Sequence, residues 1–253
     1  MRKAVVIVQA RMTSTRLPGK VLMNLGGKTV LAHVIGRCAA IPGIDTVCCA
    51  VPEGAAHDAV AREAEAAGAW VFRGSEDDVL DRYWRAAQAL KADVVMRITS
   101  DCPLVDPELC GRVLALVTEG GAEYACNNMP ASWPHGLDCE AFTFTTLDRA
   151  AREACEPYQR EHVTPWLRSN LAIAKVNLPG PGGWAAEQRW TVDFPEDMDF
   201  FRALFGALPH RTALPTTTEV LEFLRVRSDI AAINVQHHNV SRPPVPPKTQ
   251  ETP

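Results

Sequence analysis

The segment "AVVIVQARMTSTRLPGK" at positions 4–20 decides the fold that we expect for this chain. Its first five residues form an uninterrupted apolar run rich in β-branched side chains, which is typical of a strand covered on both faces. The loop that follows, residues 9–20, holds three basic and three hydroxyl side chains. A helix is predicted after this loop, and the free N–H groups at a helix start favour anions. The segment therefore predicts an anion site after the first strand of an α/β fold.

The basic side chains of this loop are Arg11, Arg16 and Lys20, and Pro18-Gly19 allows the backbone to turn sharply. Arginine grips phosphate with two parallel hydrogen bonds, whereas lysine acts as a point charge. The loop suits several adjacent anionic oxygens, and a triphosphate is the natural candidate. Neither G-x-x-x-x-G-K-[ST] nor G-x-G-x-x-G occurs in the loop, which excludes the two familiar glycine-rich phosphate loops here.

The composition is that of an ordinary globular protein, with 253 residues, 47% of them hydrophobic, and a formal net charge of −4. The net acidity argues against a nucleic-acid-binding protein, whose surface is usually basic. No apolar run approaches the roughly 20 residues that span a bilayer, and the N-terminal apolar run is shorter than the ~7–15 residues of a secretory signal. The eight cysteines include no C-x-x-C pair, so we interpret them as buried thiols in a reducing compartment. We therefore expect a cytoplasmic protein that binds neither nucleic acid nor membrane.

Strand and helix patterns alternate through the first half of the chain. This order predicts βαβ units and a Rossmann-like α/β fold, with a mostly parallel sheet flanked by helices. Ligands of such sheets bind beyond the carboxyl ends of the strands, which marks the loops 9–20, 73–78 and 100–106. Strands are predicted at 46–51, 70–72 and 93–99, and helices at 30–38, 57–69, 78–91 and 107–117.

The pattern becomes looser after position 120. We assign residues 1–236 to a single domain, in which 127–190 form a smaller β-containing insertion that binds an acceptor and serves as a dimer arm. Residues 237–253 are rich in proline and are predicted to be disordered. Strands are predicted at 137–144 and 171–178, a strand, short loop and helix over 189–205, and helices at 145–155, 159–169 (with a break near Pro165) and 216–227.

Two aspartates, Asp101 and Asp193, each follow a predicted buried strand. A nucleoside triphosphate is normally accompanied by Mg²⁺, which often takes one or two carboxylates together with phosphate oxygens and water. The two aspartates are therefore candidate metal ligands. Asp106, Glu196 and Asp197 are interpreted instead as helix-start acids, and the same alternative stays open for Asp193.

The second half of the chain is expected to bind an anionic acceptor. Arginines at the ends of strands are the side chains that we favour for binding this anion. His162 has an alternative interpretation as a packing residue of its helix. The candidate acceptor-binding residues are Arg97, Asn127, His135, Asp138, Glu140, Arg160, His162 and Arg189.

The stretch "QARMTSTRLPGKVL" resembles the nucleotide-binding signature of the cytidylyltransferases that activate acidic sugars. From about residue 3 to 225 the chain resembles the branch of spore-coat polysaccharide biosynthesis cytidylyltransferase-like proteins. The resemblance implies a fold of the nucleotide-diphospho-sugar transferase type, CTP as the nucleotide and a homodimer. It also implies Mg²⁺ held by Asp101 and Asp193. It places the CTP phosphates against Ala10, Arg11, Ser14, Arg16 and Lys20, and the nucleoside against Gly74, Ser75 and Arg82.

These features predict transfer of CMP from CTP to an acidic sugar or a small phosphate or phosphonate, with release of pyrophosphate. Arg11, Arg16, Lys20 and Asp101 are the expected catalytic residues. A glycosyltransferase-like enzyme that binds a nucleotide-sugar is one alternative, although a clear D-x-D motif is missing. A non-catalytic nucleotide-binding subunit is another. We further expect Lys20 to be an exposed loop cation whose removal leaves stability unchanged.

Overall fold

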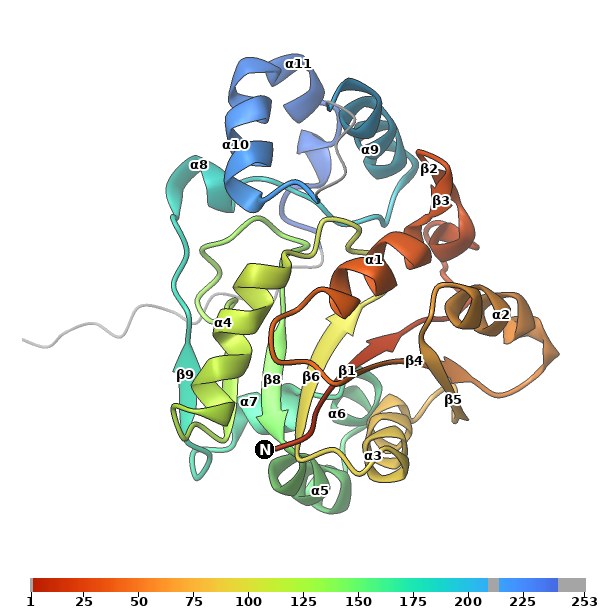
Figure 1. The fold of residues 1–253 in the computed structure, drawn as a ribbon, viewed down its shortest axis with the longest axis vertical. Coiled ribbons are helices and arrows are strands. Elements are labelled where there is room, and N and C mark those ends of the chain that lie inside the picture. Colours follow the sequence, from red (N-terminus) through yellow and green to blue (C-terminus); the bar gives the residue numbers. More distant parts are fainter. Residues whose placement is uncertain (1, 209–213, 241–253) are drawn as a thin grey trace, which may run out of the picture.

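The computed structural model describes residues 2–208 and 214–240, and its centre is a twisted sheet with helices on both faces (Figure 1). Within these residues seven strands form the sheet in the order β5-β4-β1-β6-β8-β7-β9. Most neighbours are parallel, but β8 runs antiparallel to both β6 and β7. The predicted mostly parallel α/β fold is therefore confirmed. The strands are β1 (Ala4–Gln9), β4 (Thr46–Pro52), β5 (Trp70–Gly74), β6 (Val94–Thr99), β7 (Tyr124–Cys126), β8 (Glu140–Thr143) and β9 (Lys175–Asn177).

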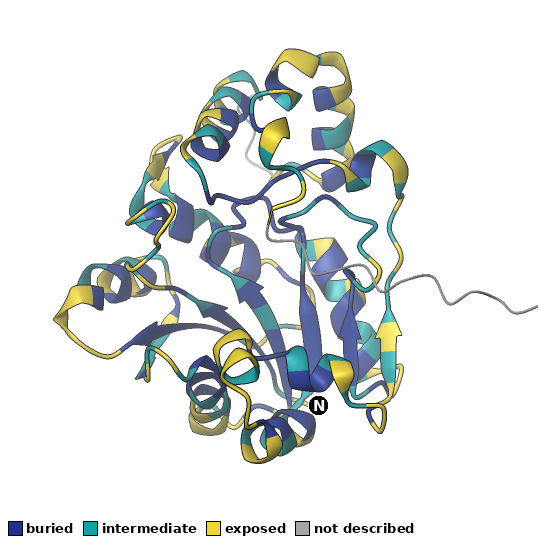
Figure 2. Ribbon diagram, turned by 180° about the vertical axis from the view of Figure 1, so that it is seen from behind, coloured by how far each residue is buried: buried dark blue, intermediate teal, exposed yellow. Residues whose placement is uncertain are grey.

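Successive side chains of β1 enter different cores, because neighbouring residues of a strand point to opposite faces of the sheet. Val6 and Val8 pack in a cluster with α1, α2 and α4, whereas Val5 and Ile7 pack with α3, α5 and α7. Figure 2 shows the resulting pattern of buried strands between helices whose outer sides are exposed. The helices are α1 (Val30–Ala39), α2 (Asp58–Ala66), α3 (Val79–Ala89), α4 (Pro107–Thr118), α5 (Phe144–Glu153), α6 (Pro157–His162) and α7 (Pro165–Ser169).

A helical cap, defined here as α9 (Pro195–Ala207), α10 (Thr217–Val226) and α11 (Ser228–Ala231), packs beyond the carboxyl end of the central parallel strands (Figure 1). Its core also takes Trp190 and Val192 from the segment that enters α9. The remaining short elements are a hairpin of β2 (Asn24–Leu25) and β3 (Lys28–Thr29), the helix α8 (Gly183–Ala186), and the 3-10 turns η1 (Lys20–Leu22), η2 (Ala55–His57) and η3 (Val235–His237). Among the described residues, no helix is both long and apolar enough to cross a membrane.

Two expectations for the second half are corrected and a third is confirmed. The strands β8 and β9 of segment 127–190 belong to the central sheet and not to a separate insertion, whereas a role of this segment as a dimer arm stays a prediction. The predicted strand at 189–193 is reduced to one bridge between His135 and Arg189. The predicted break in the helix at 159–169 is confirmed, because α6 ends at His162, α7 begins at Pro165, and Val163 between them has a φ of +68°.

The disordered tail was predicted to begin at residue 237, which is too early in the chain. His237 stacks on Phe194 with ring centroids 3.9 Å apart, and the carbonyl oxygen of Val240 accepts a hydrogen bond from Arg189 at 3.0 Å. Residues 237–240 therefore pack on the domain. The rest of that predicted tail, 241–253, lies outside the described residues.

Candidate active site

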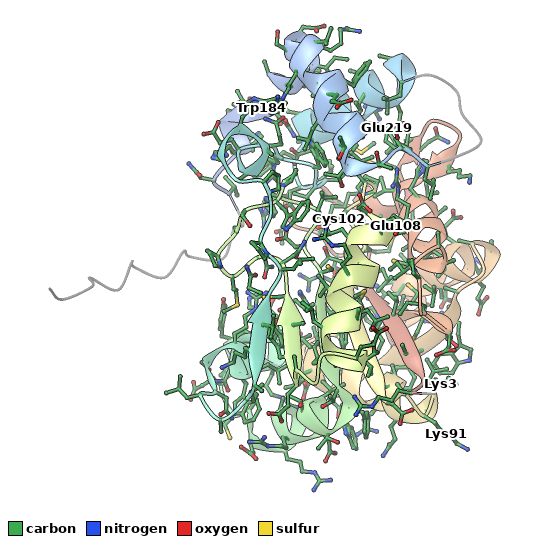
Figure 3. All side chains as sticks on the ribbon, turned by 60° about the vertical axis from the view of Figure 1, so that its left-hand side comes forward. Lys3, Lys91, Cys102, Glu108, Trp184 and Glu219 are labelled. Carbon is green, nitrogen blue, oxygen red and sulfur yellow. The ribbon has the colours of Figure 1, made fainter. Side chains whose placement is uncertain are left out.

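A cavity of about 550 Å³ opens at the carboxyl end of the central parallel strands. Figure 3 shows Cys102, one of its lining residues, at the end of the sheet opposite Lys3 and Lys91. The cavity thus lies where the sheet topology predicts a ligand. Twelve of the predicted site residues line it: Ala10, Arg11, Ser14, Arg16, Lys20, Arg82, Arg97, Asp101, His135, Asp138, His162 and Asp193.

Lys20 joins the two aspartates that the sequence marks as metal ligands. Its Nζ donates to Asp101 Oδ2 and to Asp193 Oδ1, both at 2.7 Å, and to the carbonyl oxygen of Val192 at 2.6 Å. Lys20 is buried, with an exposed fraction of 8%. The expectation of an exposed loop cation is therefore wrong, because the turn η1 directs this side chain inward to satisfy two carboxylates.

Backbone contacts explain why carboxylates ninety-two positions apart converge. The N–H of Val192 donates to the carbonyl oxygen of Asp101 at 2.8 Å, which docks the segment before α9 on the turn after β6. The N–H of Trp190 donates to the carbonyl oxygen of His135 at 2.6 Å. Asp193 precedes the N-cap residue of α9, which is Phe194, and Asp197 accepts hydrogen bonds from the N–H groups of Asp193 and Phe194 at 2.9 and 3.0 Å. The Asp193 carboxylate is directed at the cavity.

The charges of this group stabilise one another. Burial alone would lower the pKa of Lys20, but the Asp101 and Asp193 carboxylates outweigh it and raise this pKa above its ordinary value. Burial alone would likewise raise the pKa of Asp101, but Lys20 holds it well below its ordinary value. Lys20 and Asp101 are therefore both charged near neutral pH.

Several side-chain contacts fix the cationic loop 9–20 to the domain, in addition to those of Lys20. The N–H of Met12 donates to Nδ1 of the buried His57 at 3.3 Å, and the hydroxyl of Thr13 donates to Glu76 at 2.6 Å. Arg16 contacts Asp193 at 3.2 Å. Arg11 is exposed and lines the cavity. The loop thus presents two arginines and Lys20 at one side of the cavity.

Gly74 and Ser75 do not line the cavity, contrary to their predicted contact with the nucleoside. They position Arg82, which does line it. A Cβ on Gly74 would lie 3.1 Å from Arg82 Cγ, so glycine leaves room for this side chain. The carbonyl oxygen of Ser75 accepts a hydrogen bond from the Arg82 guanidinium, whereas the Ser75 hydroxyl accepts from the N–H of Asp78 at the start of α3.

Four predicted acceptor residues are occupied by structural contacts and do not line the cavity. Asn127 is buried and bridges the backbone of Leu137 and Cys139. Arg160 pairs with Asp78, and Arg189 pairs with Asp197, each by way of its Nε at 3.0 and 2.9 Å. Glu140, the fourth, is buried under the cavity floor between Arg97 and Arg168. Each correction has the same cause, a polar side chain that finds a partner inside the protein.

Several lining residues were not predicted. Arg168 has the clearest role, because it lies on the floor of the cavity beside Arg97. Its sequence context, "TPWLR", resembles an ordinary amphipathic helix and gives no signal for a site. The remaining lining residues are Gln9, Thr15, Val21, Val79, Thr99, Ser100, Cys102, Asn128, Tyr158, Glu161, Thr164, Pro165 and Thr191.

The stability of the protein is expected to depend on pH through the carboxyl group of Glu140. Burial would raise its pKa, but Arg168 and Arg97 lower it from 4.5 to about 2. A depressed carboxyl pKa contributes stability that is complete above the unfolded pKa and is lost as the pH falls through the folded one. We expect this contribution, on the order of 3 kcal/mol, to fade between pH 4.5 and 2. Urea unfolding of the native chain and of Glu140→Gln should show a stability difference that shrinks over this range; a constant difference would contradict it.

A cavity of about 550 Å³ beyond a parallel sheet, lined by a cationic loop and two carboxylates, fits a nucleotidyltransferase. Comparison with known proteins then identifies the family. The cytidylyltransferase family model matches residues 5–230, so the chain belongs to the cytidylyltransferases. The resemblance seen in the sequence and the enzyme class are thereby confirmed.

Individual relatives agree with this assignment. The chain is 33% identical to the spore coat polysaccharide biosynthesis protein SpsF of Bacillus subtilis, over 91% of this chain and 98% of that protein. It is 38% identical to a 3-deoxy-manno-octulosonate cytidylyltransferase of Anaeromyxobacter sp., over 83% of this chain and 99% of the relative. A cytidylyltransferase structure from Leptospira borgpetersenii superposes with a TM-score of 0.85 at 27% identity, covering 91% of this chain and 97% of that one.

Proposed function

We propose that the enzyme transfers CMP from CTP to an acidic sugar in a Mg²⁺-dependent reaction that releases pyrophosphate. The observation that carries the proposal is the Lys20–Asp101–Asp193 group, which lies at the rim of the same cavity as the loop arginines. The names of the relatives support the nucleotide, and that of the Anaeromyxobacter enzyme supports the acceptor class. A homodimer stays a prediction.

The phosphate end of the cavity is formed by loop 9–20. Arg11 and Arg16 supply guanidinium groups, and Ser14 supplies a hydroxyl donor. An acceptor oxygen attacks the α-phosphorus of CTP, the bond to the bridging oxygen breaks, and pyrophosphate leaves. Negative charge then develops on the phosphoryl oxygens and on the leaving group. Cations at the cavity stabilise this charge, and one of them, Lys20, is held beside it by three hydrogen bonds.

The donor set near Lys20 fits magnesium shared with a substrate. No group of three or more histidine, cysteine, aspartate or glutamate side chains in the described ranges forms a metal site by itself. Asp101 and Asp193, however, both touch the same ammonium ion, and Mg²⁺ needs only one or two carboxylates when phosphates and water complete its shell. Bound there, the metal would neutralise phosphate charge. Lys20 would then release the carboxylates and contact phosphate oxygens instead.

The first experiment is a thermal-shift screen of nucleotides in the presence of Mg²⁺. At a CTP concentration 100-fold above its Kd, the expected stabilisation is about 2.7 kcal/mol, which raises Tm by about 5–10 °C in a chain of this size. ATP, GTP and UTP should act more weakly. With 3-deoxy-manno-octulosonate as acceptor, a coupled assay should detect pyrophosphate.

The other outcomes are equally informative. If none of the four nucleotides raises Tm, the proposed function is wrong. Stabilisation by a UDP-sugar but not by CTP would indicate a glycosyltransferase-like enzyme. Stabilisation by CTP without turnover of any acidic sugar, phosphate or phosphonate would indicate a nucleotide-binding subunit.

A further inference from the structure

A charged cluster forms part of the cavity floor and is separate from the Lys20 group. It consists of Arg97 on β6, Glu140 on β8 and Arg168 on α7. Arg97 and Glu140 are direct partners in the antiparallel register, and Arg97 Nη1 lies 2.8 Å from Glu140 Oε2. Arg168 donates to Glu140 Oε1 through Nε at 2.9 Å and Nη2 at 2.7 Å.

Glu140 is held more firmly than an ordinary ion-pair partner. The Tyr124 hydroxyl donates to its Oε1, and the Thr164 hydroxyl donates to its Oε2 at 3.2 Å. Its side chain is only 1% exposed. Because both oxygens already accept two or more hydrogen bonds, Glu140 has little capacity left for a ligand. Its effect is to fix the two guanidinium planes.

The cluster has one net positive charge, because two arginines share one carboxylate. Both arginines line the cavity, with side chains 16% and 20% exposed, whereas Glu140 does not. The Nε of Arg97 is buried and has no hydrogen-bond partner within the described part of the chain. Among the neighbouring groups, Glu161 lines the cavity from the exposed side of α6, and Arg82 adds a further cation. A partly buried guanidinium that lines a cavity and is incompletely paired is typical of a site that an anion completes.

We propose that Arg97 and Arg168 bind the carboxylate of the acceptor and that Glu140 is the positioning residue for both. This inference rests on the proposed function and names the chemical group that the acceptor presents. A carboxylate carries the single negative charge that balances the cluster, and its planar shape matches the guanidinium fork. A phosphate dianion would leave the cluster with a net negative charge. The carboxylate subsite, the surface formed by Arg97 and Arg168, would hold the acceptor while its nucleophilic oxygen faces the α-phosphorus.

The subsite can be tested without knowing the full acceptor. The probes are sodium pyruvate, the neutral pyruvamide and methyl phosphate, compared by Tm and by titration at constant ionic strength. We expect pyruvate to stabilise the native chain and pyruvamide to have no effect. Arg168→Gln should weaken pyruvate binding at least about 30-fold, because a charged bidentate contact is lost. The matched control is Arg152→Gln, which removes an exposed arginine of α5 paired with Asp148 and should bind pyruvate normally.

Glu140→Asp tests the positioning role, since it keeps the charge but shortens the side chain. We expect it to weaken pyruvate binding while the Kd for CTP stays unchanged. A purely structural role would lower Tm without changing the pyruvate Kd. Arg168→Lys provides a second variant if Arg168→Gln fails to fold, and it should weaken pyruvate binding although it retains the charge.

Three results would overturn the inference: equal effects of pyruvate and pyruvamide, a preference for methyl phosphate, or normal pyruvate binding by the folded Arg168 variants. The same samples are titrated with CTP. If CTP binds and pyruvate does not, the carboxylate subsite is wrong and the proposed function stands. If CTP fails to bind, the proposed function is wrong whatever pyruvate does.

Discussion

Replacing Lys20 by alanine is expected to slow turnover of CTP by about 10²–10³-fold, the usual loss when one oriented charge is removed from a transition state. Lys20 is the cation for which this effect should be largest, because it is buried and makes three hydrogen bonds shorter than 2.8 Å. The measurement is kcat at saturating CTP and acceptor. Lys28→Ala is the matched control, since Lys28 is exposed on β3 and lies outside the cavity.

The same variant is also expected to be less stable. Without the ammonium ion, Asp101 loses its pairing with Lys20, whereas Asp193 keeps its contacts with Arg16 and Arg189. A buried charge that loses its partner costs about 3 kcal/mol or more. For a chain of this size the loss lowers Tm by about 6–12 °C. In the presence of EDTA the deficit should be complete, and Mg²⁺ should restore part of it, because the ion neutralises the same carboxylates. A normal Tm in EDTA together with normal kcat would contradict the role assigned to Lys20.

Gly136→Ala is expected to cause the largest loss of stability among the glycine substitutions. Gly136 has φ +106°, and a Cβ there would lie 2.2 Å from the carbonyl oxygen of Trp190. Backbone strain and overpacking each contribute about 1–3 kcal/mol, so we expect a total of about 3–5 kcal/mol. The clash pushes on the segment that carries Asp193, and kcat should therefore fall even well below the Tm of the variant.

Gly54→Ala separates the two causes. Gly54 has a similar φ of +99°, but a Cβ there would meet nothing within 4 Å. This control should lose only the strain contribution, about 1–3 kcal/mol. Equal losses of free energy of unfolding in the two variants would show that the close approach of residues 136 and 190 does not matter.

The parts of the fold that were predicted correctly depend on local patterns. The apolar run at 4–8 is a strand, and the alternating elements up to 118 lie within a few residues of their predicted places. The convergence of Asp101 and Asp193 was predicted from expected strand ends together with the family resemblance. The two carboxylates do converge on Lys20, although the strand expected before Asp193 is not formed. The strand predicted at 189–193 failed, since an apolar and polar alternation does not show whether a neighbouring strand is available for pairing.

The unpredicted part of the site depends on contacts between distant residues. Arg168 and Glu140 are 28 positions apart and define each other's position. Nothing local to either residue shows that one is buried and the other lines the cavity. Arg189 was assigned to the acceptor for the same reason, because its pairing with Asp197 depends on how α9 begins. Sequence patterns thus identified which charges gather at the site, but not which of them neutralise one another.

The side chains of segment 190–193 alternate between the cavity and the core of the helical cap. Thr191 and Asp193 line the cavity, whereas Trp190 and Val192 are embedded in the core of the helical cap. The cap core and the Asp193 carboxylate are therefore connected through four residues. We expect that loosening the cap core, for example at Leu224 on α10, would displace Asp193. Remodelling this outer layer is thus a way to tune catalysis while the sheet beneath stays unaltered.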